Sequence, residues 1–257
     1  MNVKITRKGL RYLKKKFKKE GLEFNKDTVV KDIEKIFEPF ADKIPDGFLI
    51  KIINGDELNG HSESLVGKKA IDINGRYIVD CYVCKDKDFA KASLVECVGH
   101  ELGHSKAFSR LPVFVILKAM FPILATKKDE FKAQLLELFC DNYAYQFSGF
   151  DKELVTKIMD EKINRRKKVY KDFQHPSWEE REKYIGLRFN EKFIRDFAEY
   201  KGFTDEVEIN NLIDYYNKVI NDDGYIRTSD LIISNIRAFY FVALIIAFCI
   251  TQIWFPF

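Results

Sequence analysis

Apolar side chains recur at helical spacing through the first part of the chain. Among the lysines of residues 7–20 they fall on one helix face, which predicts a basic amphipathic helix. The same spacing over residues 27–40 predicts a second helix, which Pro45 ends. We expect the two helices to form an N-terminal helical region over residues 1–45.

The pattern then changes to that of short strands. Residues 48–53 form an apolar run of strand length, and residues 70–73 and 76–83 flank Asn74-Gly75, a dipeptide typical of two-residue hairpin turns. We therefore expect an antiparallel hairpin. Its second strand lies directly before a long helix, where its edge can present backbone N–H and C=O groups to an extended peptide. A core strand without that role is the alternative.

Helical spacing dominates the rest of the chain. Long helices are predicted over residues 86–110 and 128–147, and shorter ones over residues 153–170, 178–188, 194–200 and 207–220. The expected fold class is α+β, with a mainly helical domain over residues 46–230 and one small antiparallel sheet.

The first long helix contains the pentapeptide His100-Glu101-Leu102-Gly103-His104. Positions i and i+4 share a helix face, so the two histidines can bring imidazole nitrogens to one zinc ion. Glu101 lies next to the first histidine, where its carboxylate can take a proton from a metal-activated water. Gly103 allows a neighbouring element to approach closely. The alternative is a pair of core or surface histidines without a metal.

Glu137 and Asp141 share one face of the second long helix, which is otherwise apolar. Buried carboxylates need partners, because an isolated buried charge is unfavourable. Glu137 is therefore predicted to be the third protein ligand, which leaves the fourth position for water. Asp141 is predicted to accept the outer N–H of a zinc-bound histidine and to fix its tautomer. A solvated pair on the outer face is the alternative.

A third motif consists of His175-Pro176-Ser177 and Arg181. From the residues alone it is a helix start, with Ser177 as the N-cap and Glu180 three residues later. That reading assigns it no chemical role.

Taken together, HELGH, Glu137-xxx-Asp141 and His175-Pro176-Ser177-xxx-Arg181 resemble the HtpX-like and CAAX-processing family of membrane zinc metallopeptidases, over about residues 70–190. The resemblance implies a gluzincin-like domain in which both histidines and Glu137 bind one zinc ion and the glutamate of HELGH activates water. It also implies that His175 stabilises the oxyanion and that Arg181 organises the zinc-binding groups. Members often have several membrane helices, whereas this chain has one clear candidate.

Charge and cysteine content narrow the picture. The 43 basic and 39 acidic side chains leave a net charge of +4, which does not predict a nucleic-acid partner. Basic runs at residues 11–19 and 165–168 can face anionic lipid headgroups, or they are solvated helix faces. The 5 cysteines are odd in number and irregular in spacing, which favours a reducing compartment over a disulfide framework. Cys81 and Cys84 are read as strand cysteines rather than as a zinc knuckle or redox pair.

Residues 238–257 are 20 positions without a charge. At about 1.5 Å per residue they span a hydrocarbon layer of roughly 30 Å, so residues 237–257 are predicted to form a C-terminal transmembrane segment. A buried core helix is the alternative. Arg227 and Arg237 precede this run, no basic residue follows it, and the N-terminus lacks a signal-peptide pattern. We therefore expect a single-pass membrane protein whose catalytic domain faces the cytoplasm.

Residues 111–125 are also apolar, and they lie between the two predicted metal-binding helices. Because His104 and Glu137 must meet at one ion, the chain between them crosses a membrane twice or not at all. About 15 residues are too few to cross twice. The segment is therefore predicted to be re-entrant or interfacial.

These observations predict a zinc-dependent endopeptidase that hydrolyses peptide bonds of membrane-proximal or membrane proteins through a metal-activated water. Its expected partners are a protein or peptide substrate and membrane lipid, with no nucleic acid. One alternative is a membrane-anchored, metallopeptidase-like sensor or interaction module with a structural zinc site, and another is a soluble helical protein with a chance HExxH. Glu101 favours the enzyme, because a structural site has no use for a general base.

Overall fold

The strands form one mixed sheet in the computed structural model, which describes residues 2–63, 69–108, 126–165 and 175–221. The strand order is β1 (Asn2–Ile5), β2 (Leu49–Ile53), β4 (Ala70–Asn74) and β3 (Gly60–Ser62). β1 pairs with β2 and β2 with β4 in parallel, whereas β3 pairs with β4 antiparallel. β3 is therefore an edge strand of this sheet.

The N-terminal helices connect the first two strands. α1 (Arg7–Lys19) begins at Thr6 and α2 (Lys26–Phe37) begins at Asn25, and in both the side chain of the N-cap accepts hydrogen bonds from backbone N–H groups of the first turn. A 3-10 helix, η1 (Glu38–Lys43), follows. The two predicted N-terminal helices are thus confirmed, and they form the crossover that a parallel strand pair requires.

The remaining helices of the described chain are α3 (Gly75–Val83), α4 (Lys87–Phe108), α6 (Lys127–Ser148), α7 (Lys152–Arg165), α8 (Trp178–Tyr184), α9 (Glu191–Tyr200) and α10 (Glu206–Asn221). α6 begins with a capping box between Thr126 and Asp129 and ends at Gly149, which has a φ of 66°. All predicted helices from residue 86 onward are confirmed within the described residues, although α8 ends at Tyr184 rather than at residue 188.

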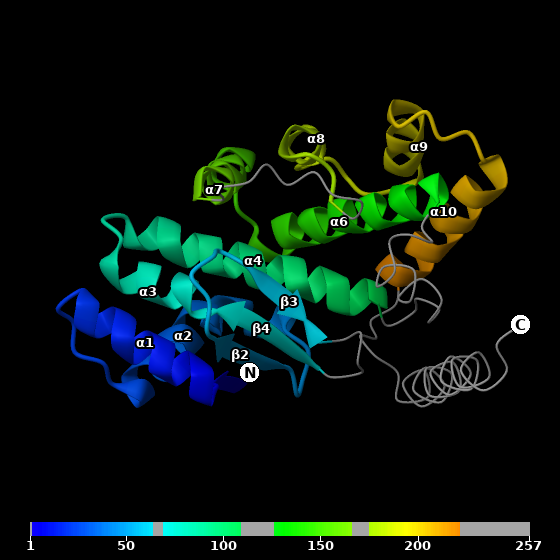
Figure 1. Ribbon diagram of the computed structural model, residues 1–257. Helices are drawn as coiled ribbons and strands as arrows, with labels where there is room; N and C mark the ends of the chain where they lie inside the picture. The colour runs from blue at the N-terminus through cyan, green and yellow to red at the C-terminus, as the bar shows by residue number, and fades with distance from the viewer. Residues whose placement is uncertain (1, 64–68, 109–125, 166–174, 222–257) are drawn as a thin grey trace, which may run out of the picture.

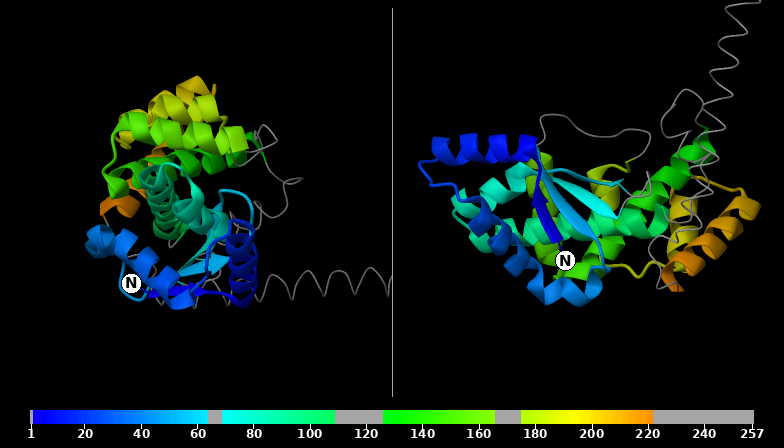
Figure 2. Two further views of the ribbon diagram at one scale, coloured as in Figure 1. Left: turned by 90° about the vertical axis from the view of Figure 1, so that its left-hand side faces the viewer. Right: turned by 90° about the horizontal axis from the view of Figure 1, so that it is seen from below.

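α4 lies at the centre of the molecule. Figure 1 shows it between the sheet and α6, with α8 and α9 on the other side of α6, and α7 packs on α4 directly. The two further views in Figure 2 agree, because α1 and α2 lie beside the sheet and away from the C-terminal helices. The helix that carries HELGH therefore has the sheet on one side and α6 on the other.

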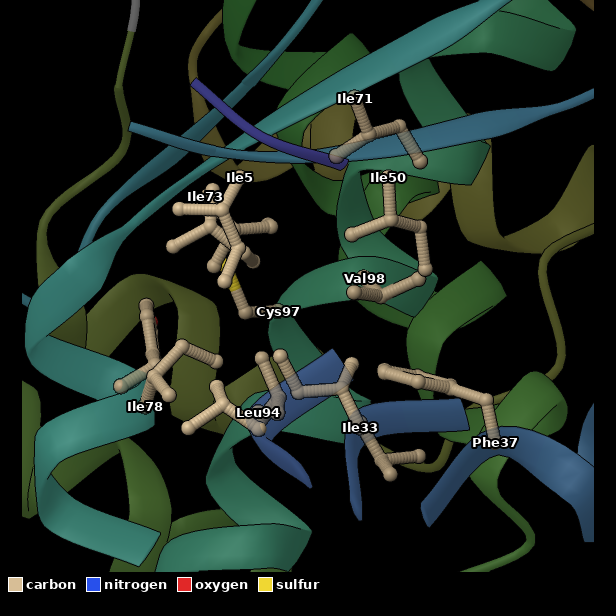
Figure 3. Close-up of a cluster of buried hydrophobic side chains, with 14 of the residues drawn as sticks. Ile5, Ile33, Phe37, Ile50, Ile71, Ile73, Ile78, Leu94, Cys97 and Val98 are labelled. Atoms are coloured by element: carbon tan, nitrogen blue, oxygen red, sulfur yellow. The ribbon is translucent and has the colours of Figure 1, made fainter. Parts of the chain in front are cut away.

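The sheet packs on α4 and α2 through side chains that exclude solvent. Ile50 of β2 and Val98 of α4 are fully buried and point toward one another in Figure 3, and Ile33 and Phe37 of α2 lie in the same cluster. Leu13 of α1 belongs to it as well. The N-terminal region therefore shares one hydrophobic core with the sheet and α4.

A second cluster of buried side chains lies between α6 and the C-terminal helices. The rings of Phe131 of α6 and Phe197 of α9 are 5.4 Å apart, and those of Phe139 of α6 and Tyr216 of α10 are 5.2 Å apart. Aromatic pairs at such separations add to the burial of apolar surface. α4 therefore belongs mainly to the first core, whereas one face of α6 belongs to the second.

The predicted antiparallel hairpin is wrong, and with it the small antiparallel sheet of the expected fold class. Residues 76–83 lie in helix α3, and Asn74 has a φ of −62°, whereas a type I′ turn needs positive φ at both central residues. Gly75 serves close packing instead, because a Cβ there would lie 2.6 Å from the ring of Tyr12. Three consecutive residues of α3, Tyr77, Ile78 and Val79, are each 1% exposed, so this helix is buried on several sides. Tertiary packing therefore overrides the strand-like composition of the segment.

The predicted transmembrane helix and single-pass localisation are corrected as well. None of the helices in the described part of the chain combines the length and the apolar character that a membrane crossing needs. The apolar runs that gave rise to these predictions, residues 111–125 and 238–257, lie outside the described residues, as do residues 166–168 of the second basic run. We therefore retain neither the membrane span nor the orientation derived from it.

The packing of the sheet on α4 yields the first prediction. Ile50→Ala should lower the free energy of unfolding by about 2–5 kcal/mol, because it leaves a cavity between β2 and α4 that the surrounding elements fill only in part. Denaturant unfolding followed by circular dichroism measures the loss. Ile220→Ala on α10 is the matched control, since that side chain is 41% exposed, and it should stay within about 0.5 kcal/mol of wild type. Equal losses in both variants would contradict this account of the core.

Candidate metal centre

The two histidines of HELGH lie one turn apart on the face of α4 that meets α6. Their Nε2 atoms are 3.1 Å apart, and their ring centroids are 4.8 Å apart. Both side chains are largely buried, with 13% exposed for His100 and 12% for His104. The helical spacing therefore brings two imidazole nitrogens to one point, as the sequence predicted.

α6 brings a carboxylate to the same point. Glu137 Oε2 lies 3.4 Å from His100 Nε2, and Glu137 Oε1 lies 3.3 Å from His104 Nε2. Ligand atoms held 2.0–2.1 Å from a tetrahedral zinc ion are about 3.3 Å from one another. The three side chains are therefore spaced like the ligands of a single metal ion. Two imidazole nitrogens and a carboxylate fit a tetrahedral zinc ion.

Two glycines of α4 allow α6 to come this close. A Cβ on Gly103 would lie 2.9 Å from the Cα of Cys140, and a Cβ on Gly99 would lie 3.0 Å from the Cα of Ala144. Both contacts are with the backbone of α6, so neither can be relieved by turning a side chain. The predicted close approach at Gly103 is confirmed, and Gly99 extends it by one turn.

Asp141 and Arg181 support the histidine that begins the motif. Asp141 Oδ1 lies 2.9 Å from His100 Nδ1, and Arg181 Nε donates to Asp141 Oδ2 over 2.7 Å. The guanidinium of Arg181 also stacks on the ring of Trp178, 4.5 Å from its centroid. The hydrogen bond at Nδ1 leaves Nε2 of His100 to face the centre, which is the arrangement typical of metal-bound histidines.

The electrostatics of this group favour a cation. Burial alone would raise the pKa of Glu137, but the charges and hydrogen bonds of His104 and His100 outweigh it and hold that pKa well below its usual value. Burial likewise opposes ionisation of Asp141, and Arg181 and His100 lower its pKa nonetheless. Burial alone would lower the pKa of His100. The hydrogen bonds to Asp141 and Glu137 outweigh burial and raise this pKa from its usual value to about 10. Both carboxylates are thus ionised at neutral pH. A metal ion would bind His100 through the same nitrogen lone pair that now holds a proton, so it would replace that proton.

Glu101 and His175 complete the predicted set. Glu101 follows His100 directly on α4 and is buried, with 6% exposed. His175, at the start of the segment that leads into α8, places Nε2 3.7 Å from Glu137 Oε1. Its side chain is 33% exposed, so it lies at the solvent side of the group.

Cys140 belongs to this group although the sequence did not suggest it. His100, His104 and Cys140 each offer a ligand atom, and these atoms lie within 4.8 Å of one another, so the three residues could hold a metal ion. Burial first, and then the charges of Glu137 and Asp141, raise the pKa of the Cys140 thiol well above its usual value. A thiol binds metals as thiolate. The raised pKa opposes this form of Cys140 while no cation is bound, and a bound cation would lower that pKa. The position of Cys140, one turn after Glu137 on the same helix, was the available signal.

Comparison of the chain with protein-family models, with curated proteins and with solved structures finds no match. The resemblance to the HtpX-like and CAAX-processing metallopeptidases therefore stays a prediction. The distances within the centre are those of this chain and do not depend on that resemblance.

The close contact between α4 and α6 yields a second prediction. Gly103→Ala should weaken metal binding by roughly 10–100-fold, the range seen when groups that support metal ligands are changed. The added methyl group forces α6 away, and Glu137 moves with it. A competition titration with a chromophoric chelator measures the affinity. Gly99→Ala makes the same change against the backbone of α6 at Ala144, which lies seven residues from Glu137, whereas Cys140, opposite Gly103, lies three residues from it. It should bind metal more tightly than Gly103→Ala, and the reverse order would refute the proposed constraint.

The choice between Glu137 and Cys140 yields a third prediction. Glu137→Gln should lose bound metal, because an amide oxygen is a weaker ligand than a carboxylate, whereas Cys140→Ala should retain one equivalent. Metal analysis of the purified variants measures both. Cobalt-loaded wild type provides an independent readout, since it should show no thiolate-to-cobalt charge-transfer band. Such a band, together with metal loss in Cys140→Ala, would assign the third ligand to Cys140 instead.

Proposed function

We propose that this chain is a zinc-dependent peptidase that hydrolyses peptide bonds. The observation that carries the proposal is the convergence of His100 Nε2, His104 Nε2 and the Glu137 carboxylate, 3.1 to 3.4 Å from one another, beside a buried Glu101. The predicted restriction to membrane-proximal or membrane proteins depended on the membrane segment, and it is not part of this proposal.

The donor set supports zinc among the common metals. Two imidazoles and a carboxylate are the ligands of one well-known class of catalytic zinc sites, which keep a fourth position open. Zinc bound there would polarise the scissile carbonyl and lower the pKa of a water molecule. His100, His104 and Glu137 would hold the ion.

The remaining side chains have roles that follow from their positions. Glu101 accepts a proton from the attacking water and then donates it to the leaving amide nitrogen, as a general base and acid. His175, at the solvent side, donates a hydrogen bond to the carbonyl oxygen as negative charge develops on it. Arg181 orients Asp141, and Asp141 fixes the tautomer of His100 through the contact at Nδ1.

An extended substrate can bind along β3. This strand replaces the segment 76–83 that the sequence suggested, because that segment is helical. β3 is an edge strand, and the hydroxyl groups of Ser62 on β3 and Ser105 on α4 are hydrogen-bonded over 2.8 Å. Ser105 follows His104 directly, so β3 runs past the metal-binding turn of α4. A peptide added to the edge of a sheet gains backbone hydrogen bonds, and here it would lie beside the centre.

Cys140 supports a second candidate function. A site closed by four protein ligands, with His100, His104, Glu137 and Cys140 all bound, is typical of structural zinc rather than of catalysis. The chain would then be a metallopeptidase-like sensor or interaction module. The cobalt spectrum and the metal content of Glu137→Gln together separate the two functions, because the closed site contains a thiolate ligand and also needs Glu137.

The general base yields a fourth prediction. Glu101→Gln should reduce hydrolysis of a dye-labelled unfolded protein by about 10²–10⁴-fold or more, because it removes the proton acceptor. It should leave one equivalent of zinc in place, since it removes no ligand. Wild-type turnover in this variant would disprove the role of Glu101.

The matched control for this experiment is Glu153→Gln on α7, whose side chain is 80% exposed. It makes the same chemical change away from the centre and should hydrolyse the substrate as wild type does. Removal of zinc with a chelator should abolish activity, and added zinc should restore it. Activity that survives complete removal of the metal would overturn the proposed function.

A further inference from the structure

One helix of the protein carries an excess of positive charge that the structure does not neutralise. Seven exposed basic side chains project from α1, and the helix has no acidic residue. We call them the basic face of α1: Arg7, Lys8, Arg11, Lys14, Lys15, Lys18 and Lys19. At about 100° per residue they cover an arc of roughly 140° over a length of about 18 Å.

On other helices, some exposed cations are paired with an acid one turn away. Lys157 bonds to Glu153 on α7 over 2.9 Å, and Lys192 bonds to Asp196 on α9 over 2.6 Å. Within the described part of the chain, no ion pair or side-chain hydrogen bond involves the basic face of α1. On α1 itself only Lys16, at the border of the face, pairs with an acid, Asp56.

This arrangement opposes the stability of α1. Like charges at i and i+4, such as Arg11 and Lys15, destabilise a helix. Arg7 and Lys8 also stand in the first turn, where the helix dipole is already positive. The helix is held by its other side, where Gly9, Leu13 and Phe17 are buried against the rest of the core. Lys18 and Lys19 stand in the last turn, where the helix dipole favours them. The other five cations of the face gain no such stabilisation, so folding alone does not account for them.

We propose that the basic face of α1 is a docking surface for an anionic phospholipid bilayer. α1 lies at the outer edge of the molecule in Figure 1, so its whole length can meet a planar surface. A planar anionic surface can meet the exposed cations along the full length of the helix at once. The face also has no exposed aromatic side chain on which a base could stack.

The contact is electrostatic and does not involve insertion. The apolar side chains of α1 are in the core, so they are not free to enter the hydrocarbon layer as those of a membrane-inserted amphipathic helix do. Attraction between lysines and anionic lipid falls off within a Debye length. The docking is therefore reversible and sensitive to salt, and it does not depend on the proposed peptidase activity.

Vesicle sedimentation with the full chain tests this proposal. Wild type should bind vesicles of phosphatidylcholine with phosphatidylserine and should bind those of phosphatidylcholine alone far more weakly. Raising the salt from about 0.1 to about 1 M shortens the Debye length from about 10 to about 3 Å and should release the protein. Equal binding to neutral vesicles, or binding that high salt does not weaken, would refute the proposal.

A pair of charge-matched variants locates the binding surface. Replacing Arg11, Lys14, Lys15 and Lys18 together by Gln should weaken binding to anionic vesicles by at least roughly tenfold. Gln has nearly the helix propensity of Lys, and the change relieves repulsion, so the unfolding temperature should not fall. The control replaces, also by Gln, one arginine and three lysines that are exposed elsewhere in the chain: Lys85, Lys152, Arg188 and Lys218.

The control should bind anionic vesicles as wild type does, because it removes the same charge from other places. A loss as large as that of the α1 variant would show that net charge, rather than this face, drives binding. Duplex and single-stranded nucleic acids, titrated at the same salt, provide the remaining arm. Tighter binding to either one than to the vesicles, lost in the α1 variant, would assign the basic face to nucleic acid and overturn the proposal.

Discussion

The close approach of α4 and α6 is the constraint on which the candidate centre depends. Gly99 and Gly103 present backbone rather than side chain to α6, and a Cβ at either position would lie within 3.0 Å of a Cα on the facing helix. At this separation the carboxylate of Glu137 lies 3.4 Å from His100 Nε2 and 3.3 Å from His104 Nε2. The second glycine lies inside the HELGH motif, so one pentapeptide supplies the histidines, the proposed base and the close contact.

A chain of two hydrogen bonds orients His100 once the helices are close. Arg181 enters from α8, bonds to Asp141 on α6, and Asp141 in turn accepts from His100 on α4. α7 packs on α4 on the side away from the sheet. Its Lys162 pairs with the buried Glu96, one turn before His100, and its Arg165 pairs with Asp80 of α3. Breaking a buried ion pair by removing one partner is strongly destabilising. The orientation of α4 is therefore set by packing on the sheet and by these charges on the other side.

The sequence predicted the parts of this structure that local spacing determines. Helical periodicity located α4 and α6 to within a few residues, and the i to i+4 spacing placed both histidines, and both acids, on common faces. The sheet was predicted less well, because β1 and β3 contain 4 and 3 residues and show too little alternation to recognise. Asn74-Gly75 has the composition of a hairpin turn, and only the packing of Gly75 against Tyr12 shows that a helix begins there. Cys140 was missed for a related reason. It lies beside His100 only because α6 packs closely against Gly103, and that contact between two helices cannot be read from local spacing.

The centre lies where two separate cores meet. The histidines come from α4, whose Leu94, Val98 and Leu102 are part of the core under the sheet, whereas Glu137 comes from α6, whose Leu135 and Leu138 pack with α9 and α10. A metal ion bound by both helices would therefore connect the two cores directly. A ligand that binds only the folded state stabilises it by RT ln(1 + [L]/Kd), so the ion would act on the whole domain rather than on one helix. Without it, the two ionised carboxylates and the histidines between them rely on Arg181 and on protons for compensation. The fold and the candidate chemistry thus depend on the same contact between α4 and α6.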